Sequence, residues 1–156
     1  MLLKVEYVEK AGFKALMAAC DIKAGTKLID LSGDTEILRE SAWNTIHITE
    51  KEHLVITTKL LYTNHCCRTP NAEFEFNTQP WLLVATRDIR KNEWVTYDYA
   101  TTEYVSGRAF DCQCSSGKCR GSFNGFSALS DDEKRDMIEK KKISPVVLAL
   151  HLKEKA

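Results

Sequence analysis

Three cysteines lie within eight residues in the last third of the chain, and their spacing is typical of a metal site. The segment Cys112-Gln113-Cys114-Ser115-Ser116-Gly117-Lys118-Cys119 brings three thiols together, and its Ser-Gly pair permits a tight turn. Three thiolates suit zinc but leave one of its tetrahedral positions open. A water molecule there would make the site catalytic, whereas a fourth cysteine would make it structural. Cys67 is the candidate for that fourth ligand.

The remaining cysteines leave alternatives open. Cys20 and Cys66 have the character of small buried hydrophobic residues, although Cys66 stands beside Cys67 and is a substitute ligand. Metal-free thiols are the alternative interpretation of the whole set. A nucleophilic pair of Cys66 and His65 is disfavoured, because adjacent residues in an extended segment point to opposite faces.

The start of the chain and its hydropathy argue against disulfides. Met1 to Val8 lacks the apolar core of a secretory signal, and the chain has enough apolar residues to fold without covalent links. No later stretch approaches the roughly 20 apolar residues that span a bilayer. We therefore expect a soluble, intracellular protein, with nucleus and cytoplasm equally open.

Length and charge limit the class of protein. The 156 residues fit one ordinary domain, and 44% hydrophobic with 28% charged residues is typical of a globular protein with a buried core. The 22 basic residues cancel the 22 acidic ones, so overall charge gives no attraction to nucleic acid or to an anionic membrane. We expect neither as a direct partner.

Short apolar runs separated by glycine, proline and asparagine predict a mainly β fold of several small sheets. We expect one short helix within residues 35–44. Asp21-Ile22-Lys23-Ala24-Gly25 is echoed by Asp88-Ile89-Arg90-Lys91-Asn92, and each segment predicts a turn with its last residue at positive φ. The predicted strands cover residues 2–8, 27–31, 53–57, 72–76, 81–85 and 94–99.

The end of the chain changes character and predicts two short helices. Ser130 is a candidate cap, followed by acidic residues at 131–133 and lysines at 140–142, an order that suits the helix dipole. Ser144-Pro145 offers a second cap with proline at the first helical position, before the apolar run at residues 146–152. That run is more typical of a helix packed on the core than of a membrane or partner helix.

The chain carries, in this order, Asn64-His65-Cys66-Cys67, Tyr97-Asp98-Tyr99 and Cys112-x-Cys114-x4-Cys119. The order of these three motifs resembles that of the SET family of protein-lysine methyltransferases. Asn64-His65-Cys66-Cys67-Arg68-Thr69-Pro70-Asn71 is similar to the signature Asn-His-Ser-Cys-x-Pro-Asn, with cysteine for serine and one extra residue before proline. Residues 88–99 resemble the second signature, which ends in Tyr-Asp-Tyr, here Tyr97-Asp98-Tyr99, with Asn92 in place of the usual glycine. The cysteine cluster followed by Arg120-Gly121 resembles the post-SET segment.

The resemblance covers roughly residues 2–125 and implies a SET-type fold. In that fold, the segment around residues 97–104 passes beneath the loop containing Asn64 and His65 as a pseudoknot. The implied regions are a SET domain at residues 1–109, a post-SET zinc-binding segment at 110–125 and a C-terminal helical tail at 126–156. In the family, the cysteine corresponding to Cys67 completes a structural zinc site.

The resemblance also implies methyl transfer from S-adenosylmethionine to a lysine side chain of a protein. Tyr99 matches the catalytic tyrosine, which also borders the cofactor. Tyr97 matches a position where a hydroxyl restricts the space around the amine and favours lower methylation states. Asn64 and His65 match residues that hold the cofactor by side-chain and main-chain hydrogen bonds, and Phe110 matches one that packs near the cofactor or the channel mouth.

One segment departs from the family. The Gly-x-Gly at which the backbone approaches the cofactor aligns with Phe13-Lys14-Ala15, so Lys14 and Ala15 occupy cofactor-binding positions with side chains in place of glycine. Gly12 offers a shifted register. The departure keeps a second hypothesis open, a catalytically silent SET-like binding module. A zinc-stapled interaction domain without an adenosyl ligand is a third.

The resemblance implies a protein substrate that presents a lysine. A histone is the first substrate class to test, and a nonhistone protein is the alternative. Glu73 and Glu75 would favour a basic peptide, although exposed acids on a strand are more often a plain solvated face. Sequence does not determine the target lysine or the oligomeric state.

Overall fold

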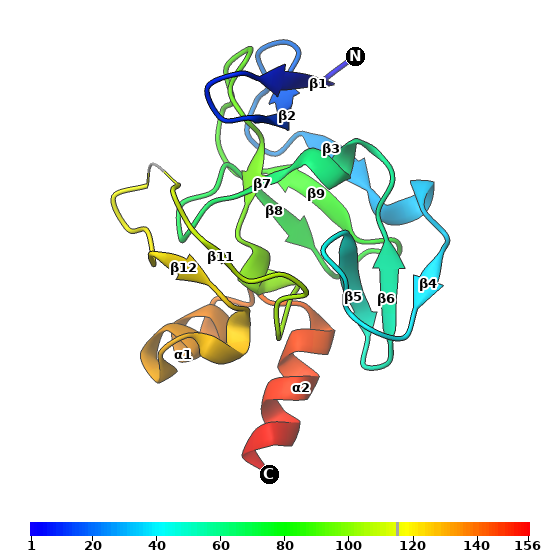
Figure 1. The fold of residues 1–156 in the computed structure, drawn as a ribbon, viewed down its shortest axis with the longest axis vertical. Coiled ribbons are helices and arrows are strands. Elements are labelled where there is room, and N and C mark those ends of the chain that lie inside the picture. Colours follow the sequence, from blue (N-terminus) through cyan, green and yellow to red (C-terminus); the bar gives the residue numbers. More distant parts are fainter. Residues whose placement is uncertain (115) are drawn as a thin grey trace. The chain divides into compact units, whose positions relative to one another are not determined.

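The computed structural model describes residues 1–114 and 116–156. Residue 115, which belongs to the predicted post-SET segment, lies outside the described residues. Figure 1 shows short strands along most of the chain and two helices near its end. The strands are β1 (Leu3–Val8), β2 (Phe13–Ala18), β3 (Lys27–Asp30), β4 (Ile37–Leu38), β5 (Thr45–Thr49), β6 (Glu52–Val55), β7 (Asn64–His65), β8 (Ala72–Glu75), β9 (Leu82–Ala85), β10 (Thr96–Tyr97), β11 (Phe110–Asp111) and β12 (Ser122–Phe123). The helices are α1 (Asp131–Glu139) and α2 (Pro145–Lys155), with 3-10 turns at Leu31–Gly33, Lys59–Tyr62, Tyr99–Thr101 and Phe126–Ala128.

The contacts within the chain define two compact units. The first unit comprises Met1–Gly33, Thr57–Asp98 and Cys114–Cys119. The second unit comprises Asp34–Ile56, Tyr99–Gln113 and Arg120–Ala156. Each sheet lies wholly within one unit.

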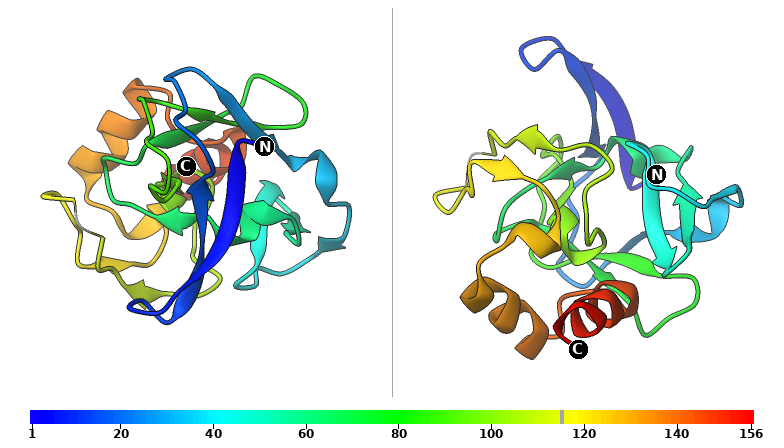
Figure 2. Two further views of the ribbon diagram at one scale, coloured as in Figure 1. Left: turned by 90° about the horizontal axis from the view of Figure 1, so that it is seen from above. Right: turned by 60° about the horizontal axis from the view of Figure 1, so that its bottom comes forward.

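The first unit is built from small sheets. β1 and β2 form an antiparallel hairpin, drawn in blue in Figure 2. At its turn the N–H groups of Ala11 and Gly12 both donate to the Val8 carbonyl, and Gly12 takes the positive φ of 77° that reverses the chain. β3, β9 and β8 form an antiparallel sheet in that order, and β7 pairs with β10 in parallel.

The two echoed turns, residues 21–25 and 88–92, cap each other. The Asp21 carboxylate accepts a hydrogen bond from the Lys91 N–H at 2.9 Å. In the reciprocal position, the Asp88 carboxylate accepts one from the Ala24 N–H, also at 2.9 Å. Each aspartate thereby satisfies a main-chain donor of the other turn, so the two repeated segments form a structural pair.

The same turns adopt the predicted backbone geometry. Gly25 has a φ of 85° and Asn92 a φ of 72°, which glycine and asparagine tolerate best. Ile22 and Ile89 form a β-bridge between the turns, and both side chains are buried. The paired turns hold the segment that leads to β10 against the segment that leads to β3.

The second unit has a β4-β6-β5 sheet, a β11-β12 hairpin pair and both helices. Its core brings the residues after β10 together with β12 and the helices. The buried members are Ala100, Phe123, Phe126, Met137, Ile143 and Val147, with Tyr99, Tyr104, Phe110, Leu129, Ile138 and Leu148 packed against them. The apolar run of α2 is therefore partly core, as predicted.

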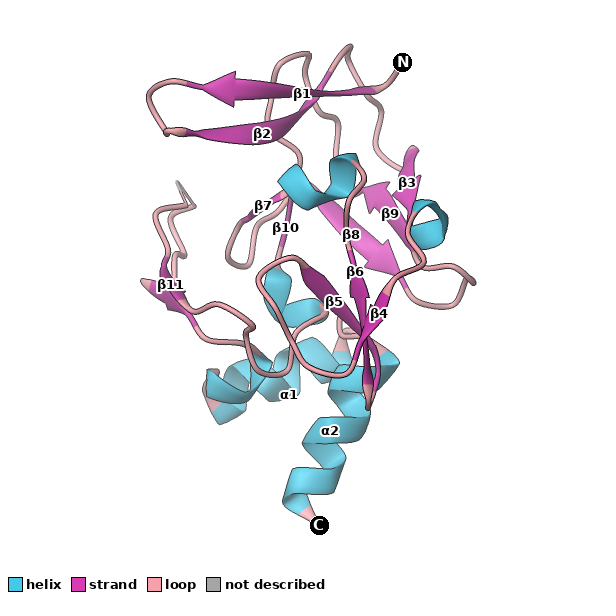
Figure 3. Ribbon diagram, turned by 45° about the vertical axis from the view of Figure 1, so that its right-hand side comes forward, coloured by secondary structure: helices cyan, strands magenta, loops and turns pink. Residues whose placement is uncertain are grey.

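Both helices begin at the predicted caps, and Figure 3 shows them in cyan. The Ser130 hydroxyl accepts from the Glu133 N–H at 3.2 Å, and the Ser144 hydroxyl accepts from the Val147 N–H at 3.0 Å. The Arg120 guanidinium binds the Glu133 carboxylate at 2.9 Å, with both side chains largely buried. None of the described helices is long and apolar enough to cross a bilayer.

The predicted mainly β fold of several small sheets with two C-terminal helices is confirmed. Every predicted strand overlaps an observed one, although only β10 forms within residues 94–99. The strands that sequence reasoning missed are β2, β4, β5, β7, β11 and β12.

The predicted helix within residues 35–44 is wrong. Ile37 and Leu38 form β4, the edge of the sheet, where they pair with Leu54 and His53 of β6. Ile37, Leu38 and Trp43 are all exposed, so no apolar stripe exists to bury a helix face. Hydrogen bonding to β6 satisfies this backbone instead.

Glu103 is a buried acid in the second unit. One carboxylate oxygen accepts a hydrogen bond from the His47 N–H of β5 at 3.3 Å, while the other is buried with no partner among the described residues. Burial raises the pKa of Glu103 from about 4.5 to about 8, so the carboxyl stays neutral near pH 7. The nearby stacked imidazoles of His47 and His53 have pKa values lowered by burial, so they add no positive charge at neutral pH to offset an ionised Glu103.

Replacing Glu103 with glutamine should change how stability depends on pH. Between the two pKa values, the unfolded chain loses a proton that the folded chain keeps, so the free energy of unfolding falls as pH rises through this window and levels off above about 8. Glutamine mimics the neutral acid and does not titrate, so Glu103→Gln removes this pH-dependent loss of stability. Each unit of difference between the folded and unfolded pKa corresponds to roughly 1.4 kcal/mol. The variant should therefore gain a few kcal/mol relative to the parent at pH 8 compared with pH 5.

Urea unfolding at both pH values measures this difference. Glu73→Gln, at an exposed position of β8, is the matched control for loss of one carboxyl group. A Glu103→Gln effect equal at pH 5 and pH 8 would show that Glu103 has the same pKa in the folded and unfolded chain.

Candidate functional site

The two signature motifs lie side by side in the first unit. β7 and β10 run parallel, with Asn64 opposite Thr96 and His65 opposite Tyr97. The Cys66 N–H extends this ladder by donating to the Tyr97 carbonyl at 3.1 Å. Residues that are more than thirty positions apart in sequence therefore share one short ladder.

Asn71, the last residue of the first motif, fixes the approach to β10. Its side-chain oxygen accepts from the Thr96 N–H at 2.9 Å, and its amide donates to the Trp94 carbonyl at 2.8 Å. The side chain is buried, so these bonds are shielded from water. Sequence reasoning assigned Asn71 no role, although its place in the motif was a signal that it mattered.

The Asn64 side chain fits a ligand-binding role. Its amide nitrogen is buried and has no hydrogen-bond partner among the described residues. A buried donor without an acceptor costs about 1–3 kcal/mol, so such groups in native proteins call for an explanation. A bound molecule with an oxygen acceptor at this position would remove that cost.

His65 lies between two other groups of the motifs. Its Nε2 is 3.2 Å from the Cys67 sulfur, and its Nδ1 is 3.7 Å from Oδ1 of Asp98. The side chains of His65 and Asp98 are both buried. Asp98 also accepts from the Arg68 N–H at 3.5 Å, and Arg68 takes a positive φ of 61° at that position.

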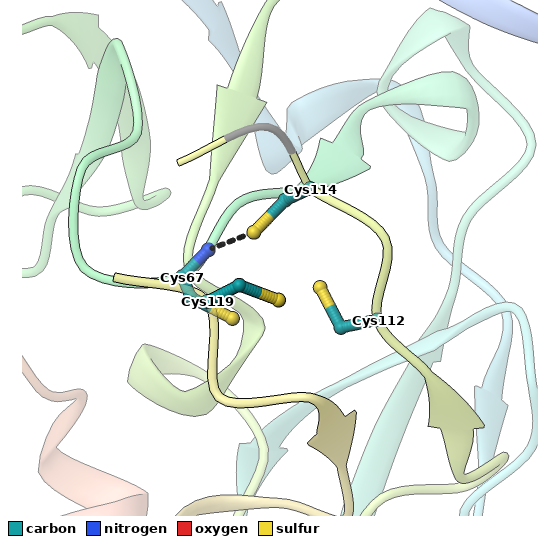
Figure 4. A group of neighbouring side chains, drawn as sticks. All are labelled: Cys67, Cys112, Cys114 and Cys119. Atoms are coloured by element: carbon teal, nitrogen blue, oxygen red, sulfur yellow. Dashed lines mark hydrogen bonds between the residues drawn. The ribbon is translucent and has the colours of Figure 1, made fainter. Parts of the chain in front are cut away.

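The predicted ligand set comes together as a cluster of four sulfurs. The Sγ atoms of Cys67, Cys112, Cys114 and Cys119 all lie within 4.8 Å of one another, and Figure 4 shows them facing a common centre. Tetrahedral zinc with Zn–S bonds of about 2.3 Å requires sulfurs about 3.8 Å apart, so the spacing suits that ion. The cluster is compatible with zinc and has a closed set of four thiols.

Local hydrogen bonds shape the cluster. The Cys119 N–H donates to the Ser116 carbonyl at 3.3 Å, which closes the turn predicted at Ser116-Gly117. The Cys67 N–H points at the Cys114 sulfur at 3.5 Å, drawn as a dashed line in Figure 4. Arg68 donates to the Lys118 carbonyl at 2.7 Å and ties the first motif to the same loop.

The two remaining cysteines are outside the group of four sulfurs, although the Cys66 side chain interacts with Cys114. Cys66 is not among the four grouped sulfurs, and its own sulfur contacts the Thr69 hydroxyl at 3.9 Å. Burial raises the pKa of the Cys66 thiol, which opposes nucleophilic chemistry. Cys20 is half-buried in the first unit and is also outside the group. The alternative that Cys66 replaces Cys67 as a ligand is therefore not supported.

Tyr99 sits in an aromatic group of the second unit. Its ring meets Phe110 of β11 edge-on at 6.2 Å and Phe123 of β12 edge-on at 5.9 Å. Burial raises the pKa of the Tyr99 hydroxyl, which keeps it a neutral phenol at physiological pH. Phe123 was missed from sequence, because a single phenylalanine after Gly121-Ser122 carries no motif.

Tyr97 belongs to a separate aromatic contact in the first unit. Its ring meets Phe74 of β8 edge-on, with 5.0 Å between the centroids. The Tyr97 side chain is buried. This position is compatible with both interpretations of Tyr97, a core aromatic residue and a residue that restricts the amine pocket.

Lys14 and Ala15 lie in β2 with ordinary strand geometry. Neither has a positive φ, so the side chains that replace glycine cause no backbone strain. Ala15 is fully buried, whereas Lys14 is exposed with its ammonium 5.7 Å from the centre of the Tyr62 ring. Their assignment as cofactor-binding residues stays a prediction.

Comparison with known proteins agrees with this arrangement. The model of the family described as the SET domain matches residues 14–100. The chain is 31% identical to a putative histone-lysine N-methyltransferase, ASHH4, of Arabidopsis thaliana and 29% identical to the histone-lysine N-methyltransferase ASHH3 of the same plant. It is also 29% identical to the methyltransferase flvH of Aspergillus flavus over 47% of its own length and 40% of that protein.

The matches to the plant relatives cover most of this chain but less than half of each relative. The alignments to the two plant proteins cover 76% of this chain but only 38% and 37% of theirs. The SET match spans more than half of the chain and includes both signature motifs that meet at β7 and β10. The chain belongs to the SET domain family.

Proposed function

We propose that the protein transfers a methyl group to the amine of a lysine side chain in a protein substrate. The pairing of β7 with β10 carries this proposal, because it brings the Asn64-His65 motif into register with the strand that leads to Tyr99. The cofactor would be S-adenosylmethionine, and the four cysteines would hold a structural zinc ion. Both plant relatives are described as histone-lysine methyltransferases, which makes a histone the first substrate to test.

The residues present fit the cofactor. When bound, S-adenosylmethionine supplies a methyl group on a positively charged sulfonium. The unpaired Asn64 amide would donate a hydrogen bond to an acceptor of the cofactor, which removes the cost of its burial. The side chains at Lys14 and Ala15 leave the local backbone unstrained, which favours an active protein over the silent binding module.

The tyrosines would act by position. Methyl transfer to an amine needs aligned reactants about 3–3.5 Å apart more than it needs an acid and a base. Tyr99, a neutral phenol packed edge-on against Phe110 and Phe123, would offer an electron-rich oxygen to the positive charge at the reacting atoms. Tyr97 is fixed by Phe74, so its hydroxyl would limit the room around the amine and favour lower methylation states.

The zinc ion would be structural. Four thiolate ligands leave zinc no open position for water, which excludes it from the chemistry. Its role would be to hold Cys112, Cys114 and Cys119 close to Cys67. The strand β11, which carries Phe110, leads directly into this segment.

The first experiment is titration of the zinc-loaded protein with S-adenosylmethionine by calorimetry, followed by transfer of labelled methyl groups to histones and to a protein extract. Saturable binding and labelled lysine would support the proposal, with the labelled band separating histone from nonhistone substrates. An intact fold that binds no cofactor would instead support the silent binding module.

Replacing Tyr99 with phenylalanine should lower kcat about 100-fold, the usual effect of losing one group that stabilises a transition state. Affinity for S-adenosylmethionine should change much less, because the ring and its contacts with Phe110 and Phe123 remain. Steady-state kinetics and calorimetry on the same preparation separate the two effects. Tyr7→Phe, at a strand position that is 62% exposed, is the matched control, and equal turnover in both variants would refute a catalytic Tyr99.

Replacing Cys119 with serine should remove bound zinc and expose the segment around residues 110–121 to proteolysis. A serine hydroxyl is a poor zinc ligand, and three remaining thiolates bind the ion far more weakly. Metal analysis after dialysis and limited proteolysis measure the two effects. Cys20→Ser should keep about one zinc per chain, whereas an unchanged zinc content in Cys119→Ser would rule out the four-cysteine site.

A further inference from the structure

The imidazole of His65 contacts both the cysteine cluster, at Cys67, and Asp98, which follows β10. His65 is the last residue of β7, and Cys67 follows two positions later in a bend that brings the two side chains together. The resulting Nε2 to Sγ distance is 3.2 Å, short for a nitrogen and a sulfur. Both groups are buried, so water does not compete for the contact.

Metal binding would settle which atom donates in this contact. A cysteine bound to zinc is a thiolate, which has no hydrogen and only accepts. The Nε2 atom must then carry the hydrogen and donate it to sulfur. Hydrogen bonds to an ionised acceptor are about twice as strong as neutral ones, and such contacts orient metal ligands and tune their basicity.

The other side of the ring faces the strand that leads to Tyr99. Nδ1 is 3.7 Å from the Asp98 carboxylate, and Asp98 is the residue between the two tyrosines of the second motif. Asp98 is also reached by the Arg68 N–H from the cysteine side. One rigid imidazole therefore touches a proposed zinc ligand and the residue that precedes Tyr99.

We propose that His65 is a positioning residue that donates a hydrogen bond from Nε2 to the Cys67 thiolate and so couples the cysteine site to the tyrosine-bearing strand. This inference rests on the proposed zinc site. The cofactor role implied for His65 is compatible with it, since that role uses the main chain and this one uses the imidazole. Loss of the ring would weaken metal binding without removing any ligand.

Two variants with side chains of different length test whether Nε2 of His65 is the hydrogen-bond donor. His65→Gln keeps an amide N–H near the position of Nε2, whereas His65→Asn is one methylene shorter and places its amide near Nδ1, facing Asp98 and short of Cys67. The glutamine variant should stay close to the parent in zinc affinity. His65→Asn and His65→Leu should each bind zinc about 10- to 100-fold more weakly, the usual effect of removing a hydrogen-bond partner of a metal ligand.

Cobalt(II) in place of zinc gives a readout that a merely structural role would not change. A hydrogen bond to the thiolate lowers the energy of the sulfur electrons, so its loss should shift the sulfur-to-cobalt charge-transfer band to longer wavelength. We expect this shift in His65→Asn and His65→Leu and a near-parental band in His65→Gln. Cys20→Ser, which changes a half-buried cysteine outside the group of four sulfurs, should leave band and affinity unchanged.

Competition with a chelator measures zinc affinity, and melting of the metal-free proteins measures folding separately. Parental band and affinity in both His65→Asn and His65→Leu would overturn the inference while leaving the zinc site intact. Failure of the parent chain to take up either metal would overturn the zinc site itself, and with it this inference. If His65→Leu does not fold, the comparison of asparagine with glutamine still decides the matter.

Discussion

The parallel pairing of β7 with β10 is the contact on which the rest of the site depends. It is only two residues long on each side, far shorter than a strand pair that is stable alone. Parallel strands also require a long connection, here residues 66–95. The pair therefore persists because its surroundings hold it: Asn71 binds both Thr96 and the Trp94 carbonyl, and the buried Val95 donates its N–H to the Leu16 carbonyl at 2.8 Å.

The scaffold of the first unit explains how so short a ladder keeps its register. The echoed turns at residues 21–25 and 88–92 lock together through reciprocal aspartate caps, which fixes where the chain enters the segment before β10. β2 then bonds directly to that segment through Leu16 and the Met17–Trp94 bridge. A slip by one residue would turn Tyr97 and its neighbours to the opposite face, and each of these contacts opposes such a slip.

Sequence predicted the features that depend on local chemistry. The serine caps, the positive φ of Gly25 and Asn92, the glycine turn among the cysteines and most apolar strands all follow from neighbouring residues. Long-range features did not follow. β7 has no apolar run to mark it as a strand. The segment with Ile37 and Leu38 was predicted as a helix, but these side chains are exposed on an edge strand. Nothing in the sequence around Glu103 indicates that its carboxyl is buried. The pairing of the two motifs came from family resemblance, because spacing alone does not encode a contact across thirty residues.

Although the overall charge of the chain is zero, the cysteine cluster would concentrate negative charge at one place. Four thiolates around one divalent cation would carry net negative charge, and Asp98 adds another acidic group close by. Charge in a half-buried place needs hydrogen-bond donors to replace water. The donors are found among the motif residues: the Cys67 N–H faces the Cys114 sulfur, the Arg68 N–H faces Asp98, and the Arg68 guanidinium is held at the Lys118 carbonyl. The first motif would thus supply one thiol ligand of the proposed zinc site, and it provides hydrogen-bond donors around that thiol and the strand that pairs with β10. This overlap of roles explains why so many polar residues occupy eight consecutive positions.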